Sequence, residues 1–163
     1  MPRQKGAVNW KTLAVIGLVI VAIWITIGRF SGDEGKIRKQ IKAAEQAIEN
    51  QDPFAFLMVF SKDYEDEKMI QFGVIFKLAQ TAFGKYDDVD VDVSNVNIEI
   101  KGDSATVTLD IWGEATIAST KGKETMPVRE GFQEKDSKIM FRKEGSKWLI
   151  ISSKNIRMAS AVR

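Results

Sequence analysis

The chain has 163 residues and a nearly balanced charge, with 24 lysines and arginines against 22 aspartates and glutamates. It contains no histidine and no cysteine, which excludes disulfides, thiol nucleophiles, imidazole bases and zinc sites made from these ligands. Arg3, Lys5, Lys11 and Arg29 precede every acidic residue. The rest of the chain holds 20 basic against 22 acidic residues, which gives no reason to expect nucleic acid as a partner.

Residues 12–28 form an apolar run without charge or proline, about 25 Å long as a helix and so close to the hydrocarbon thickness of a bilayer. We predict a cytoplasmic tail at residues 1–11 and an uncleaved transmembrane anchor at residues 12–30, because no small-x-small cleavage site follows the run. A buried helix of a soluble domain is the alternative. The residues assigned to the anchor, which has aromatic rings near both ends, are Trp10, Leu13, Gly17, Ala22, Trp24, Thr26 and Phe30.

The tail before the anchor is positively charged and contains no acid, which favours a cytoplasmic N-terminus. We therefore expect a single-pass protein of the cell (inner) membrane, with its C-terminal domain on the periplasmic or other extracytoplasmic side. Small residues such as Gly17 and Ala22 would let another helix approach the anchor, and a purely lipid-facing tether fits them equally well.

Apolar residues at helical spacing predict three helices after the anchor. The first covers residues 36–49, and its basic residues at 36–42 are either a contact for lipid headgroups or an ordinary solvated face. Asp52 is suited to cap a second, short helix that is apolar enough to lie in the core. The third helix is predicted over residues 69–83.

After the helices the apolar period changes to two, which predicts antiparallel strands. The apolar phase shifts by one residue at Ser94-Asn95, as a β-bulge would produce. Hairpin turns are expected at residues 101–104 and 143–146. Between them, residues 119–137 are polar and are predicted to contain a loop and the start of the next strand, while residues 158–163 are predicted to be a frayed tail.

This order of elements resembles the nuclear-transport-factor-2-like superfamily, which also contains polyketide-cyclase-like enzymes. The resemblance rests on the two hairpins, Val96 to Val107 and Phe141 to Ile150, and on the leading helix that ends at residues 47–52. It implies an α+β fold in which three helices pack on a curved antiparallel sheet, forming a cone whose mouth can hold a ligand. We assign residues 31–157 to this domain.

Enzymes of this superfamily place an aspartate, tyrosine or histidine in the cone for proton transfer, and this chain has no histidine. No residue aligns with a family catalytic position, so no catalytic residue and no cofactor is predicted. Polar and aromatic residues expected near the cone mouth are the candidate contacts for a ligand or partner. They are Asp63, Tyr64, Tyr86, Trp112, Glu114, Arg129 and Phe132.

Asp88, Asp90, Asp92 and Glu99 have the spacing of positions one, three, five and twelve of a calcium-binding loop. Val93, however, stands where the tight turn of such a loop needs glycine. Aspartates that alternate with valines are typical of a strand with one solvated face, and we therefore predict no metal site.

We predict a membrane-anchored, non-catalytic binding or scaffolding module that acts as an accessory subunit of a larger membrane complex. Its expected partners are the lipid bilayer, other subunits of that complex and a small apolar ligand in the cone, without nucleic acid. One alternative is an inner-membrane subunit that resembles those of type IV secretion channels. Another is a membrane-tethered small-ligand binder or a cyclase- or isomerase-like enzyme.

Overall fold

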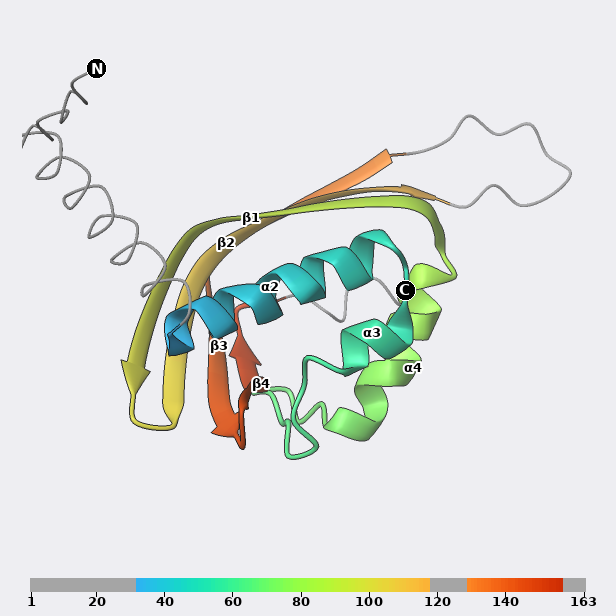
Figure 1. Ribbon diagram of the computed structural model, residues 1–163. Helices are drawn as coiled ribbons and strands as arrows, with labels where there is room; N and C mark the ends of the chain where they lie inside the picture. The colour runs from blue at the N-terminus through green and yellow to red at the C-terminus, as the bar shows by residue number, and fades with distance from the viewer. Residues whose placement is uncertain (1–31, 118–128, 157–163) are drawn as a thin grey trace, which may run out of the picture.

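The computed structural model describes residues 32–117 and 129–156 and confirms the predicted α+β class (Figure 1). The elements in chain order are α2 (Asp33–Glu49), α3 (Pro53–Leu57), α4 (Phe72–Phe83), β1 (Tyr86–Lys101), β2 (Ser104–Ile117), β3 (Arg129–Glu144) and β4 (Lys147–Lys154). Among the described residues, no helix is long and apolar enough to cross a bilayer. The predicted anchor at residues 12–30 and the predicted tails at residues 1–11 and 158–163 lie outside the described part of the chain.

The four strands form one antiparallel sheet in the order β1-β2-β3-β4, with each strand paired to the next one in the sequence. The sheet is strongly curved, and α2 lies along its concave side, while α3 and α4 lie toward one end (Figure 1). The free edge of β4 is extended by the segment after α3, where the Ser61 N–H donates to the Ile150 carbonyl at 2.8 Å. Helices and sheet therefore share one core, as the resemblance implied.

The core follows the predicted period of two along β2, where Ala105, Val107 and Leu109 are buried. They pack in one cluster with Ile37 of α2 and Phe141 of β3, both fully buried. Burying a large apolar side chain stabilises a fold by about 1.5–3 kcal/mol. The concave face of the sheet is thus the face that carries odd-numbered residues of β2.

Two bulges at the middle of the sheet produce its bend, and the one predicted at Ser94-Asn95 is confirmed. A second, in β3, lies opposite Asp110 of β2. The Asp110 carboxylate binds both, because Asn95 Nδ2 donates to Oδ2 at 2.7 Å and the Asp136 N–H donates to Oδ1 at 2.9 Å. Asn95 and Asp136 have φ of +51° and +52°, the left-handed conformation that asparagine and aspartate tolerate best after glycine.

The third helix begins at Phe72 rather than at residue 69 as predicted. Met69 has a φ of +62°, which interrupts a right-handed helix at this point. Asp66 Oδ1 accepts the N–H groups of Lys68 and Ile70, at 2.9 Å and 2.8 Å, and so forms a turn in place of a first helical turn.

The predicted cap of the short helix is confirmed, since Asp52 Oδ1 accepts the N–H groups of Phe54 and Ala55 at 2.9 Å each. The helix is less buried than predicted, because Phe54 is 69% exposed. The strand start predicted within residues 119–137 lies at Arg129, so most of the stretch after it belongs to β3. The first half of β3 is polar because few other residues of the described chain pack on it.

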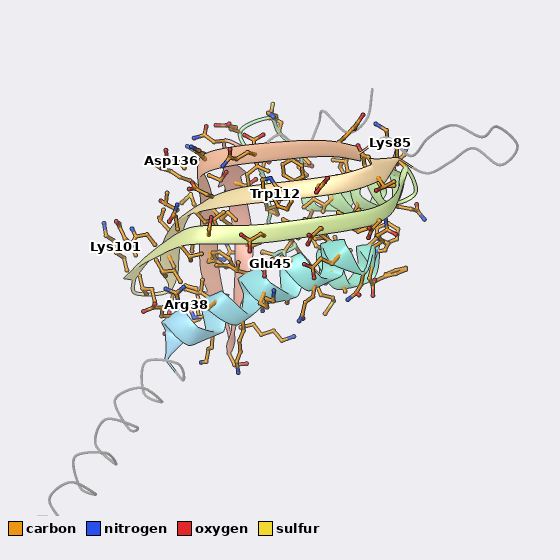
Figure 2. The ribbon with its side chains drawn as sticks, turned by 90° about the horizontal axis from the view of Figure 1, so that it is seen from above. Arg38, Glu45, Lys85, Lys101, Trp112 and Asp136 are labelled. Carbon is orange, nitrogen blue, oxygen red and sulfur yellow. The ribbon has the colours of Figure 1, made fainter. Side chains whose placement is uncertain are left out.

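The basic residues of α2 mostly have acidic partners on the same helix. Arg38 pairs with Glu34 at 2.9 Å, and Lys42 pairs with Glu45 at 2.8 Å. Glu45 also accepts the N–H of Val93 on the open edge of β1 at 3.1 Å (Figure 2). These pairs are what the solvated-face interpretation expects, while the contact with lipid headgroups stays a prediction.

Candidate functional site

The seven candidate residues do not form one group. Asp63 and Tyr64 lie in the segment between α3 and α4, and Trp112 and Glu114 lie on the convex face of β2. Tyr86 and Phe132 lie on the concave face. Arg129 is the first residue of β3 and pairs with Thr116.

Asp63 belongs to an ion-pair cluster that fastens this segment to the β3–β4 hairpin. Arg142 Nη2 lies 2.6 Å from Asp63 Oδ2 and 2.7 Å from Glu144 Oε1, while Ser61 Oγ donates to Glu144 Oε1 at 2.6 Å. Hydrogen bonds from Ser61 and Arg142 lower the pKa of Glu144, and hydrogen bonds to Glu144 and Asp63 raise the pKa of Arg142. Each group already has its partner in the cluster, so we assign the cluster a structural role.

Tyr64 is a core residue and not a mouth residue. It is 1% exposed, and its hydroxyl lies 2.7 Å from Ser153 Oγ of β4. Burial raises the pKa of Tyr64, and the hydrogen bond to Ser153 opposes that rise. A ligand outside the core cannot reach this hydroxyl.

Trp112 and Glu114 face away from α2. The register places Trp112 between Asp92 and Gln133, and Glu114 between Asp90 and Gly131. Trp112 is 41% exposed and lies near the middle of the sheet (Figure 2). These two candidates therefore lie on the opposite face of the sheet from any ligand in the cone.

The concave face carries a group of residues at the end of the sheet that β4 does not reach, where β2 pairs with the first half of β3. Glu134, Phe132 and Glu130 of β3 pair with Ile111, Gly113 and Ala115 of β2, and directly paired residues share a face. Because odd-numbered residues of β2 face the core, these three side chains of β3 face the concave side as well. We name as the mouth site Tyr86, Gly113, Glu130, Phe132 and Glu134.

Tyr86 is held at this site from two sides. Gln51 Nε2 donates to the Tyr86 carbonyl at 2.8 Å, which ties the start of β1 to the end of α2. The Tyr86 hydroxyl donates to Glu130 Oε2 at 3.2 Å, and Lys85 Nζ lies 5.2 Å from the centre of the tyrosine ring. A phenol hydroxyl and a carboxylate thus meet on the concave face.

Gly113 is required where the ring of Phe132 crosses β2. A Cβ atom at position 113 would lie 2.2 Å from Phe132 Cε1, which is far inside van der Waals contact. The glycine lets the ring rest on the strand, and the ring remains 47% exposed. Phe132 therefore gives the site an accessible apolar surface beside the two carboxylates.

A carboxylate and a hydroxyl at hydrogen-bond distance can move a proton to and from a substrate. Within the described ranges, no group of three or more acidic, histidine or cysteine residues could hold a metal ion. The sequence patterns indicated Tyr86 and Phe132 but not Gly113, Glu130 or Glu134. The signal that could have found the two acids is the spacing of two between Glu130, Phe132 and Glu134, which predicts one face of a strand within the stretch expected to hold a loop and the start of a strand.

Solved structures with a similar fold include proteins named as enzymes. A protein named a dehydratase of the NTF2-like family, from Streptomyces avermitilis, matches with a TM-score of 0.62 and 12% identity over 74% of this chain and 93% of that chain. Hexachlorocyclohexane dehydrochlorinase LinA type 2 matches with a TM-score of 0.57 and 10% identity, over 73% and 80%. Bd1075 from Bdellovibrio bacteriovorus has a TM-score of 0.57 and 16% identity over 74% of this chain, which spans 40% of that protein. No protein-family model and no curated protein sequence matches.

These neighbours overturn the prediction of a non-catalytic scaffolding module, because proteins named as a dehydratase and a dehydrochlorinase share the architecture. They favour the alternative of a small-ligand binder or enzyme, and they lend no support to contact with other membrane-complex subunits. At such low identity a structural likeness establishes the fold and not the reaction. Residues 32–117 and 129–156 thus have the nuclear-transport-factor-2-like fold that their helix order and hairpins indicated.

Proposed function

We propose that this chain binds a small, largely apolar carbonyl compound at the mouth site and catalyses proton transfer at the carbon beside the carbonyl group. The observation that carries the proposal is the hydrogen bond from the Tyr86 hydroxyl to Glu130, on the concave face and close to the exposed ring of Phe132. The enzyme-named neighbours with the same fold support it.

In the proposed reaction, Glu130 accepts a proton from the carbon next to the substrate carbonyl group. The Tyr86 hydroxyl turns from Glu130 to the carbonyl oxygen and stabilises the enolate by a hydrogen bond. Glu130 then returns the same proton, either to a departing hydroxyl group, which leaves as water, or to a more distant carbon, which gives an isomer. Phe132 supplies the apolar surface on which the substrate carbon skeleton packs.

The test measures turnover of small cyclic β-hydroxyketones and β,γ-unsaturated ketones, whose conjugated products absorb in the near ultraviolet. Glu130→Gln is expected to lower the rate by about 10²-fold or more, the usual contribution of a general base. Tyr86→Phe is expected to lower it as well, because the enolate loses its donor. Glu99→Gln, the same change at an exposed position on the convex face of β1, is the matched control and keeps full activity.

Two results would overturn the proposal. One is turnover that Glu130→Gln and Glu99→Gln leave equally unchanged. The other is a panel in which no compound is converted and every compound raises the melting temperature of the intact protein no more than that of Glu130→Gln. A site that binds such ligands stabilises the folded state by mass action, so the intact protein should show the larger rise.

The location of the domain is a separate proposal. The apolar run at residues 12–28 and the positive charge before it support a single-pass anchor, with the N-terminus in the cytoplasm and the domain on the extracytoplasmic side. The full chain should stay in the membrane pellet after alkaline carbonate extraction. External protease should digest the domain in spheroplasts; protection of the domain there would show the opposite orientation.

A further inference from the structure

The end of α2 requires a backbone conformation that glycine adopts most readily. Asn50 closes the helix in a right-handed conformation, and Gln51 follows with a φ of +53°. The Gln51 N–H donates to the Ile48 carbonyl at 3.0 Å, and the next N–H, that of Asp52, donates to the Ala47 carbonyl at 2.9 Å. This pair of hydrogen bonds is the Schellman motif, whose left-handed residue is usually glycine. The backbone by itself therefore favours glycine at position 51.

Glutamine is an unusual residue in this conformation. Five residues other than glycine have a positive φ in the described part of the chain, and three of them are asparagine or aspartate, which tolerate it best. The other two are Met69 and Gln51. The Met69 side chain is 78% exposed, whereas Gln51 is half-buried and its side chain reaches a residue 35 positions later. An unfavourable conformation that the fold retains is a reason to look for a role of that side chain.

The partner of the Gln51 side chain is the residue that brings a hydroxyl to the mouth site. Gln51 Nε2 donates to the Tyr86 carbonyl at 2.8 Å, and the Tyr86 hydroxyl donates to Glu130 Oε2 at 3.2 Å. Tyr86 is the first residue of β1, and the pairing of β1 with β2 is irregular between Tyr86 and Asp88. The regular ladder of the sheet therefore does not fix Tyr86, and the amide of Gln51 supplies a second attachment from α2.

We propose that Gln51 is a positioning residue, whose amide fixes the backbone of Tyr86 and so keeps the tyrosine hydroxyl beside Glu130. The chain thus holds glutamine where the backbone favours glycine, at a cost in stability that the geometry of the site explains. The placement of the tyrosine does not depend on any reaction. Its effect on turnover rests on the proposed function.

Gln51→Gly separates the two roles of this position, because it relieves the backbone and removes the amide. Gln51→Asn is a second variant, since asparagine tolerates a positive φ but its amide is one methylene group shorter. Met69→Gly is the matched control, because it relieves the same conformation at an exposed side chain. In the full chain, Gln51→Gly should melt within about 3 °C of the intact protein or above it, because the relieved conformation offsets the lost hydrogen bond.

Two measurements report on Tyr86 itself. The chain has two tyrosines, so labelling with fluorotyrosine gives two fluorine NMR signals, which Tyr64→Phe assigns. Both Gln51 variants should move the Tyr86 signal toward that of the unfolded chain and leave the Tyr64 signal in place, whereas Met69→Gly should move neither. For any ketone that is converted, both Gln51 variants should lower kcat about tenfold and change KM less than about twofold, because the displaced hydroxyl stabilises the transition state poorly while the Phe132 ring still binds the substrate.

A Tyr86 signal that stays where it is in the intact protein would overturn the proposal, as would turnover that Gln51→Gly and Met69→Gly leave equally unchanged. If Gln51→Gly melts far lower and both tyrosine signals move together, the amide supports the whole fold rather than one residue, and the proposal fails as well. If only the Tyr86 signal moves and no ketone is converted, the proposed reaction fails and the positioning of Tyr86 stands.

Discussion

The buried hydrogen bond between Tyr64 and Ser153 can be tested by a double-mutant cycle. Tyr64→Phe keeps the ring but leaves Ser153 Oγ, which is 5% exposed in the intact protein, without its partner. Ser153→Ala likewise leaves the Tyr64 hydroxyl unpaired in the core. A buried polar group that loses its partner costs about 1–3 kcal/mol, so each single variant should lose that much free energy of unfolding.

The double variant removes both polar groups and leaves neither one unpaired. Its loss should therefore be smaller than the sum of the two single losses, by a coupling energy of about 1–2 kcal/mol. Urea unfolding followed by circular dichroism and by tryptophan fluorescence measures all four proteins, and agreement of the two signals justifies the two-state treatment. Losses that simply add would refute the inference that the two hydroxyls are each other's partner.

The same tyrosine predicts the response to alkali. Burial raises the pKa of Tyr64 above its ordinary value of 10.0, so the folded state holds the phenolic proton more tightly than the unfolded chain does. The stability from this difference is complete below the pKa of the unfolded chain and is lost as the pH rises through the pKa of the folded state. Unfolding free energy should fall above about pH 10 in the intact protein and fall less steeply in Tyr64→Phe. Parallel curves would contradict this.

Three further predictions concern the bend and the mouth site. The hydrogen bond from Asn95, and next the one from the Asp136 N–H, lower the pKa of Asp110 below its ordinary value of 3.8. The stability that Asp110 contributes is therefore present above that value and is lost as the pH falls through the folded-state pKa. On acidification, the melting temperature of Asp110→Asn should therefore fall less steeply than that of the intact protein. Gly113→Ala should cost about 1–3 kcal/mol in urea unfolding, because the Phe132 ring must leave the strand, while Gly73→Ala, with open space at its Cβ, should not destabilise the protein. Deletion of Asp136 should destabilise the domain by at least about 2 kcal/mol, because polar side chains of β3 then face the core. Asp136→Gly is the control, since it removes the same side chain and tolerates the positive φ. Equal melting temperatures for the deletion and for Asp136→Gly would contradict the assigned bulge.

Sequence patterns identified the features of the fold that depend on local periodicity. The switch from helical spacing to alternation located the change from helices to sheet, and the phase shift at Ser94-Asn95 located a bulge that the structure contains. Asp52 was recognisable as a cap because its side chain satisfies N–H groups two and three residues away. These are contacts within a few residues, which a sequence window includes.

The candidate site depended on pairing between distant segments, which no such window includes. Tyr64 and Ser153 are 89 residues apart, so a polar tyrosine in a turn-like stretch gave no sign that its hydroxyl lies in the core. Trp112 and Phe132 are both exposed aromatic residues on strands, yet they lie on opposite faces. Only the register with β2 separates the concave residue from the convex one.

The bulge at Asp136 links the shape of the sheet to the chemistry of its mouth. In β3, the odd-numbered residues Phe141, Ile139 and Ser137 face the concave side of the sheet. Without the bulge this alternation would continue, and Lys135, Gln133 and Gly131 would face the concave side as well. One extra residue opposite Asp110 reverses the phase, so that Glu134, Phe132 and Glu130 face inward instead. The bulge that the Asp110 carboxylate binds therefore does more than bend the sheet: it brings two acids and an aromatic ring, rather than a lysine and an amide, to the surface where a ligand would bind.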